Sequence, residues 1–132
     1  MYSFGSTSQE RLEQLDIRLQ DILKEAIKFY DFSIITGYRN KEEQEKMFNQ
    51  GKSKLRYPNS NHNQNPSKAV DIAPYPIDWN DTNRFVYLAA IIQYIAFSKG
   101  VKIRWGGNWD MDNDIIKDQT FNDLLHFEIV EV

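Results

Sequence analysis

The 132-residue sequence contains no cysteine, and it has only two histidines, four prolines and six glycines. Without cysteine there is no disulfide framework and no thiolate ligand, so any metal site must use histidine, aspartate or glutamate side chains. No apolar run approaches the roughly 20 residues of a membrane span, and residues 1–5 lack the basic and apolar regions of a signal peptide. We therefore expect a protein that is made and held in the cytoplasm, without a membrane span.

A broad excess of positive charge is also absent. The formal net charge of −3 and the pI of about 5.4 argue against a basic face for nucleic acid. Residues 52–56 are the densest basic stretch, which we interpret as a solvated loop. The length fits one domain that spans residues 1–132, and the sequence shows no internal repeat.

Apolar periodicity and turn residues divide the chain into alternating helices and strands. A capping-box pattern at Thr7 and Glu10, followed by apolar residues at helical spacing, predicts one long first helix over residues 7–30. The sequence predicts further helices over residues 41–50 and 82–99, and strands over residues 32–36, 69–73, 101–105 and 125–130. In the last strand His126 and Glu128 share one face.

The two histidines and one aspartate form the strongest candidate site. His62 lies on a polar loop, Asp71 on an apolar strand and His126 on the last strand, and the three can converge at the centre of an antiparallel sheet. Burial of an unpaired Asp71 carboxylate costs several kcal/mol, and a metal supplies a partner. Two neutral imidazoles and one carboxylate leave a fourth tetrahedral position for water, which is typical of a catalytic zinc site. Taken singly, each of these residues has an ordinary structural explanation.

These residues stand in motifs with a family likeness. The motifs are Ser60-Asn61-His62, Ala69-Val70-Asp71 and Asp123-Leu124-Leu125-His126, together with Trp105-Gly106-Gly107 and with Thr36-Gly37-Tyr38-Arg39 followed by Gln44 and Gly51. Through them nearly the whole chain resembles the phage and bacterial zinc peptidases of the L-alanyl-D-glutamate endopeptidase and D-alanyl-D-alanine carboxypeptidase group. One departure is that eight residues separate His62 from Asp71, where six are commonest in that group.

The resemblance implies an α+β fold of the hedgehog/DD-peptidase type, with a central antiparallel sheet and helices on its outer side. It implies a zinc ion held by His62, Asp71 and His126, and Asp123 as the general base. The other expected site residues are Arg39 for an oxyanion or a substrate carboxylate, Ser60 and Trp105 for substrate, Glu128 to orient a ligand imidazole, and Trp109 and Tyr75 along the groove. Ser60, Glu128 and the aromatic residues also have ordinary alternatives, as a loop serine, a solvated strand residue and core side chains.

The activity that the resemblance implies is hydrolysis of the L-alanyl-D-glutamate bond in the peptidoglycan stem peptide, by a phage-type endolysin. Because the sequence shows no repeat, we expect residues 1–132 to form a single catalytic domain without a separate wall-binding domain. Such an enzyme waits in the cytoplasm as a monomer until a holin releases it to the cell wall during host lysis. Two alternatives stay open: a D-alanyl-D-alanine carboxypeptidase or dipeptidase, and a non-catalytic, hedgehog-like zinc module that binds wall peptides.

A second metal hypothesis concerns Asp110, Asp112 and Asp114, whose alternating carboxylates resemble the opening of a calcium loop. Ile115 and Phe121 stand where an EF-hand needs its glycine and its bidentate acid. The alternative is a solvated acidic loop.

Overall fold

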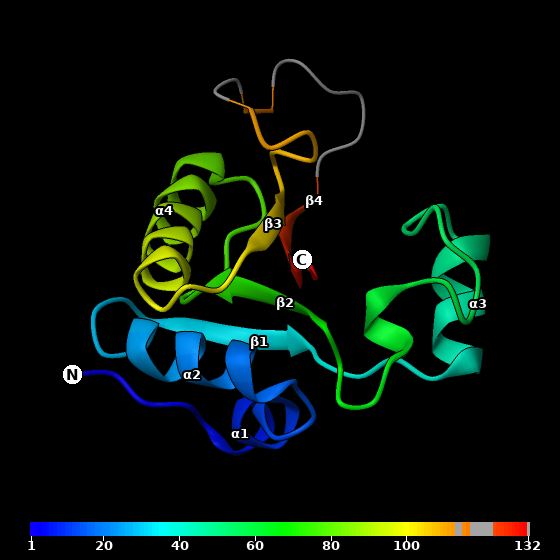
Figure 1. Ribbon diagram of the computed structural model, residues 1–132, viewed down its shortest axis with the longest axis horizontal. Helices are drawn as coiled ribbons and strands as arrows, with labels where there is room; N and C mark the ends of the chain where they lie inside the picture. The colour runs from blue at the N-terminus through cyan, green and yellow to red at the C-terminus, as the bar shows by residue number, and fades with distance from the viewer. Residues whose placement is uncertain (113–114, 117–122, 132) are drawn as a thin grey trace.

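The computed structural model describes residues 1–112, 115–116 and 123–131, and its strands form a four-stranded antiparallel sheet in the order β1-β2-β4-β3 (Figure 1). The strands are β1 (Phe32–Thr36), β2 (Ala69–Pro74), β3 (Ile103–Gly106) and β4 (Asp123–Ile129). Each lies where the sequence predicts a strand, although β3 begins two residues later and β4 two residues earlier than predicted. β2 and β4 are neighbours at the centre of the sheet, so segments far apart in the sequence meet there.

The helices within the described ranges are α1 (Ser6–Leu12), α2 (Ile17–Ala26), α3 (Lys41–Asn49) and α4 (Thr82–Ser98), and a single 3₁₀ turn, η1 (Asn61–Asn63), follows α3. The predicted start of α3 is confirmed, because Asn40 and Glu43 form a reciprocal capping box. Gly51 and Gly100, with φ of +73° and +71°, follow α3 and α4 closely and supply the left-handed conformation common after helices. None of the helices in the part of the chain that the structure describes is long and apolar enough to cross a membrane.

The prediction of one helix over residues 7–30 is wrong, because the chain breaks between α1 and α2. The backbone of this break pairs with a distant loop: Asp16 N donates to Ser67 O at 2.8 Å, and Ser67 N donates to Gln14 O at 2.9 Å. The Asp16 carboxylate then accepts a hydrogen bond from Arg18 N and caps α2. The expected capping box at Thr7 is wrong as well, since Gly5 is the N-cap of α1 and makes no side-chain cap.

One face of the sheet carries the hydrophobic core. α2 packs against α4, α4 packs on β2, β3 and β4, and α1 contacts β1. Alternation along the central strands sends Val70 and Ile72 of β2, and Phe127 and Ile129 of β4, into this core. α3 lies beyond the end of β1, away from α2 and α4 (Figure 1). The α+β arrangement with a central antiparallel sheet is therefore confirmed, and the opposite face of β2 and β4 is left for polar side chains.

Candidate active site

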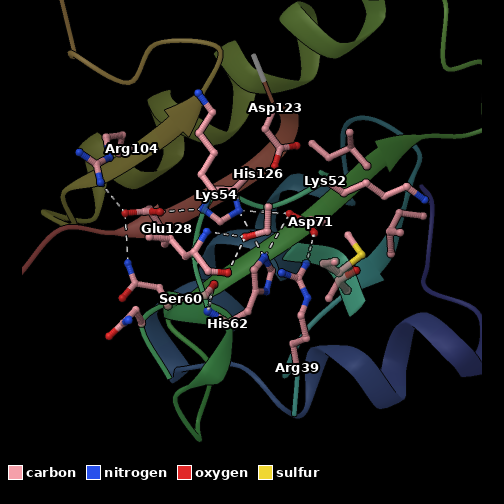
Figure 2. A pocket seen from close by; sticks show the side chains of 18 of the residues that line it. Arg39, Lys52, Lys54, Ser60, His62, Asp71, Arg104, Asp123, His126 and Glu128 are labelled. Carbon is pink, nitrogen blue, oxygen red and sulfur yellow. Dashed lines mark hydrogen bonds and ion pairs between the residues drawn. The ribbon is translucent and has the colours of Figure 1, made fainter. Parts of the chain in front are cut away.

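His62, Asp71 and His126 meet on the face of the sheet opposite the core (Figure 2). Asp71 and His126 are direct partners across β2 and β4, and η1 brings His62 to them. His62 Nε2 lies 3.3 Å from both Asp71 Oδ1 and His126 Nδ1, and His126 Nδ1 lies 3.2 Å from Asp71 Oδ1. All three side chains are buried. One atom of each residue therefore points to a common centre, and the group could hold a metal ion.

The outer nitrogens of the two imidazoles have acceptors of their own. His62 Nδ1 lies 2.8 Å from Gly37 O, and His126 Nε2 lies 2.7 Å from Glu128 Oε1. A carbonyl and a carboxylate accept hydrogen bonds, so these nitrogens carry the protons of the neutral rings. The inner nitrogens then face Asp71 with lone pairs, and a proton or a metal cation between the three groups would offset their mutual repulsion.

The ionisation of the cluster points to the same need for a cation. Burial opposes the charged form of His126, but hydrogen bonds to Asp71 and Glu128 outweigh it and raise the pKa of His126 to about 10. Burial likewise disfavours ionised Asp71, yet the imidazoles of His62 and His126 hold its pKa below the ordinary value. Without a metal the cluster retains a proton on His126, and a divalent cation would take that proton's place.

Asp71 is bound on its other carboxylate oxygen by Arg39, which is in turn bound by Gln44. Arg39 Nη2 lies 3.3 Å from Asp71 Oδ2, and Arg39 Nη1 donates to Gln44 Oε1 at 3.0 Å. Gln44 is fully buried, and its amide nitrogen donates to Ser53 Oγ and to Leu55 O. The guanidinium is therefore held between a candidate metal ligand and the α3 side of the groove. The family resemblance marks Gln44 as a motif residue but does not give its role, because its partners Ser53 and Leu55 lie on a loop beyond Gly51.

Glu128 lies beside His126, where the sequence places it. Its Oε1 accepts from His126, while Oε2 accepts from Arg104 Nη2 at 2.8 Å and from Asn61 Nδ2 at 3.1 Å. Burial alone would raise the pKa of Glu128. The hydrogen bonds from His126 and Arg104, together with the positive charges of these two residues, outweigh burial and lower this pKa to about 2. Glu128 is therefore an anion that fixes the orientation and the tautomer of His126.

A register shift brings Asp123 to the same groove. Trp105 pairs with Phe127, but Gly106 pairs with Asp123 instead of the His126 that an unbroken register would place there. This shift places Asp123 opposite Gly106, on the face that Glu128 also occupies. A Cβ on Gly106 would lie 2.0 Å from Asp123 O, so only glycine fits. Burial first, and then the Asp71 charge, raise the pKa of Asp123 to about 6.

The remaining predicted residues divide between the groove and the core. Ser60 is buried beside the groove, and its hydroxyl accepts a hydrogen bond from His62 N, so it holds η1. Trp109 lines the groove, with its ring centroid 5.4 Å from that of His126. Trp105 does not line it: its indole is 2% exposed, stacks on Phe127 and belongs to the core. The placement of Trp105 at the substrate is therefore corrected, because odd-numbered side chains of β3 face the helices. Tyr75 lies outside the groove lining as well.

The groove has a volume of about 1010 Å³, and its described lining residues come from segments spread along the chain between Ile35 and Glu128. The lining residues that sequence patterns alone did not assign to the site include Lys52, Lys54, Trp79 and Arg104. Only the three-dimensional packing reveals them, because basic loop residues and single aromatic residues are common on protein surfaces.

The calcium hypothesis receives no support. Asp110 and Asp112 are exposed, and Asp114 lies outside the described residues, as does Phe121. Among the residues that can be described, the group that could hold a metal is the one formed by His62, Asp71 and His126.

The chain is similar to known proteins in sequence and in fold. A family model described as phage L-alanyl-D-glutamate peptidase matches residues 1–130. The L-alanyl-D-glutamate peptidase of Escherichia phage T5 is 31% identical to this chain over 137 residues, which cover 98% of each protein. The crystal structure of the Serratia marcescens L-Ala D-Glu endopeptidase ChiX superposes with a TM-score of 0.78 at 24% identity, over 96% of this chain and 89% of that one. At 24% identity, the likeness to ChiX shows that the two proteins share a fold.

Proposed function

This chain belongs to the phage L-alanyl-D-glutamate peptidase family, and we propose that it hydrolyses the L-alanyl-D-glutamate bond of the peptidoglycan stem peptide with zinc held by His62, Asp71 and His126. The observation that carries the proposal is the convergence of three lone-pair donors and a half-buried carboxylate, Asp123, on one groove. The superposition on ChiX supports assignment to the hedgehog/DD-peptidase fold.

The donor set fits zinc. Nitrogen and oxygen ligands at about 2.0–2.1 Å from a tetrahedral zinc ion lie about 3.3 Å from one another, and the three observed separations are 3.2–3.3 Å. Zinc in such a site polarises a carbonyl group and makes water more acidic. The two histidines and Asp71 present nitrogen and carboxylate ligands, the set that zinc accepts when cysteine is absent.

Asp123 is the proposed general base. It lines the groove near the ligand cluster, and its pKa is raised toward neutrality, which suits a group that must both accept and return a proton. As a carboxylate it takes a proton from the attacking water and then delivers it to the leaving amine of the D-glutamyl half. Because the Arg39 guanidinium is bound by Asp71 and Gln44, we assign Arg39 to holding Asp71, in place of the direct substrate contact expected from the sequence.

The biological setting follows from the family. Hydrolysis of the stem peptide cuts the cross-linked wall, and in a phage it serves host lysis. The alternative of a non-catalytic module is disfavoured by Asp123, since a site that only binds peptide does not need a half-buried carboxylate with a raised pKa in the groove of its metal ligands. The D-alanyl-D-alanine alternative is disfavoured by the family that matches residues 1–130.

The test is hydrolysis of synthetic peptides by the zinc-loaded protein, followed by mass spectrometry. A peptide with an L-alanyl-D-glutamate bond is expected to be cut at that bond, and one with a D-alanyl-D-alanine bond is expected to stay intact. Asp123→Asn should keep its zinc and lose about 10²–10⁴-fold in kcat/KM, because an amide cannot accept the proton. Asp21→Asn, an exposed change on α2, is the matched control. Parent-level turnover by Asp123→Asn would assign the base elsewhere.

A further inference from the structure

His62 is supported differently from the other two candidate ligands. Asp71 and His126 are held by the pairing of β2 with β4, whereas His62 is carried by η1, a 3₁₀ turn of three residues. Such a short turn has few hydrogen bonds of its own, so its position depends on its contacts with other segments. These contacts therefore determine whether His62 Nε2 lies within reach of Asp71 and His126, each 3.3 Å away.

One set of hydrogen bonds attaches η1 to the α3 side of the groove. Arg39 N donates to His62 O at 2.8 Å, and Asn63 Nδ2 donates to Arg39 O at 2.9 Å. Asn63 Nδ2 also donates to Gln44 Oε1 at 3.3 Å. None of these three bonds involves β4, the strand that carries His126, so they do not by themselves set the distance between the two imidazoles.

Asn61 attaches the other side of η1 to β4. Its Nδ2 donates to Glu128 Oε2 at 3.1 Å, and its Oδ1 accepts from Gln64 Nε2 at 3.2 Å. An ionised carboxylate only accepts hydrogen bonds, so the amide must present its NH₂ group to Glu128. The backbone of Asn61 is held as well, because Lys68 N donates to Asn61 O at 3.2 Å just before β2 begins. The residue next to His62 is therefore fixed against the centre of the sheet.

Glu128 is a rigid point of attachment for Asn61. It is buried, and its carboxylate accepts from three side chains on three elements: His126 on β4, Arg104 on β3 and Asn61 on η1. Figure 2 shows Glu128 between Arg104 and His126. Hydrogen bonds to an ionised group are stronger than those between neutral groups, so this carboxylate cannot shift without losing several of them. One side chain thus connects both histidines, His126 directly and His62 through Asn61.

We infer that Asn61 is a positioning residue for the metal site. By donating to Glu128 it holds η1 against β4, so that the same carboxylate places the loop-borne imidazole and the strand-borne imidazole relative to each other. His62 is then in position before a metal ion arrives, and less conformational entropy is lost when the ion binds. The inference rests on the metal site of the proposed function, and it adds a residue outside the ligand set that determines metal affinity.

A double-mutant cycle on zinc affinity tests whether Asn61 acts through Glu128. Competition with a chromophoric chelator gives the affinities of the parent, Asn61→Ala, Glu128→Met and the double variant. In the parent background Asn61→Ala should weaken zinc binding by about three- to tenfold, as expected for one hydrogen bond to a charged group behind a ligand. In the Glu128→Met background it should change the affinity by less than about twofold, because methionine offers no carboxylate. An equal loss in both backgrounds would overturn the inference.

Two further variants control for charge and for the loss of an asparagine side chain. Asn83→Ala removes an exposed amide on α4, outside the groove lining, and should keep the parent affinity. Asn61→Asp keeps the shape of the side chain but cannot donate to Glu128, so it should bind zinc more weakly than the parent. Its added negative charge would by itself strengthen zinc binding. Tighter zinc binding by Asn61→Asp would therefore show that charge, and not this hydrogen bond, governs the affinity, and would overturn the inference.

Hydrogen exchange of the metal-free protein tests the position of η1 without zinc and without turnover. The amides of Arg39 and Asn63 donate to His62 O and Ser60 O, so their protection reports whether the turn stays in place. Both should exchange at least about threefold faster in Asn61→Ala, while the amide of Ile92 in α4 should keep its parent rate. Parent-like exchange of Arg39 and Asn63 in this variant would overturn the inference, whatever the zinc affinities show.

The same measurements separate this inference from the proposed function. Faster exchange in Asn61→Ala supports the positioning role even if the parent takes up no zinc, in which case the proposed zinc chemistry fails alone. If the parent binds zinc and the cycle gives the expected affinities, but no L-alanyl-D-glutamate peptide is cut, the proposed hydrolysis fails and the role of Asn61 stands.

Discussion

Replacement of Glu128 by glutamine tests how the protein sets the tautomer of His126. In the parent, one carboxylate oxygen accepts from His126 Nε2 at 2.7 Å and the other accepts from Arg104 and Asn61. Glutamine has the same shape but offers one acceptor and one donor. If its oxygen faces His126, its NH₂ group meets two donors; if its NH₂ group faces His126, the ring loses the acceptor that directs its proton outward.

The expected loss of zinc affinity follows from the hydrogen bond that His126 loses in this variant. Hydrogen bonds to a charged partner contribute about 1.5–3 kcal/mol, and loss of an acceptor behind a metal-binding histidine lowers metal affinity by about 10–100-fold. Zinc affinity is measured by competition with a chromophoric chelator at neutral pH. Glu131→Gln is the matched control, because it makes the same charge change at an exposed position whose carboxylate pairs with Arg18 and Lys68.

The expected result is weaker zinc binding in Glu128→Gln and parent affinity in Glu131→Gln. Nitrogen-15 NMR of the metal-free and zinc-loaded protein reports the His126 tautomer directly, and the zinc-loaded parent should carry the proton on Nε2. Parent zinc affinity in Glu128→Gln, or a proton on the other ring nitrogen, would refute the reasoning that Glu128 prepares His126 as a ligand.

Three other predictions follow from the site. Zinc at about a thousand times its dissociation constant should stabilise the native state by about 4 kcal/mol and raise the Tm by roughly 10–20 °C, and calorimetry of His126→Ala should show no such shift. Because the pKa of Asp123 is raised to about 6 and only the carboxylate accepts a proton, kcat/KM should rise with pH through this value, and a flat profile there with bound zinc unchanged would contradict its role as base. Gly106→Ala should lower kcat/KM by at least about tenfold through displacement of Asp123, whereas Gly5→Ala, where a Cβ meets nothing within 4 Å, should behave like the parent.

Local signals in the sequence were sufficient for several elements. The start of α3 is specified by Asn40 and Glu43, which sit next to each other in space and need nothing distant, and Gly51 follows with its left-handed conformation. The alternation in β4 likewise predicts that His126 and Glu128 share a face. These features depend on residues within one or two turns, so the pattern that encodes them is visible in the sequence.

The features that were wrong or missed depend on long-range contacts. The break before Asp16 is stabilised by hydrogen bonds to Ser67, and a helical pattern cannot report a partner some fifty residues away. Trp105 faces the core because of the register of β3, and Asp123 reaches the groove because of a shift in that register at Gly106. Gln44 gives no sign in the sequence that it connects Arg39 to the loop at Ser53.

The pairing of Asp71 with His126 restricts where the length of this chain can change. A single residue inserted into β2 or β4 ahead of either ligand would turn that ligand toward the helices and bring a core side chain out, so both the site and the core would be lost together. Insertions are tolerable only in the connections between strands. The same constraint can be used in protein engineering. Two fragments of the chain, one with β2 and the other with β4, can bind zinc tightly only when they associate in the native register. Zinc binding would therefore report correct pairing of the two strands.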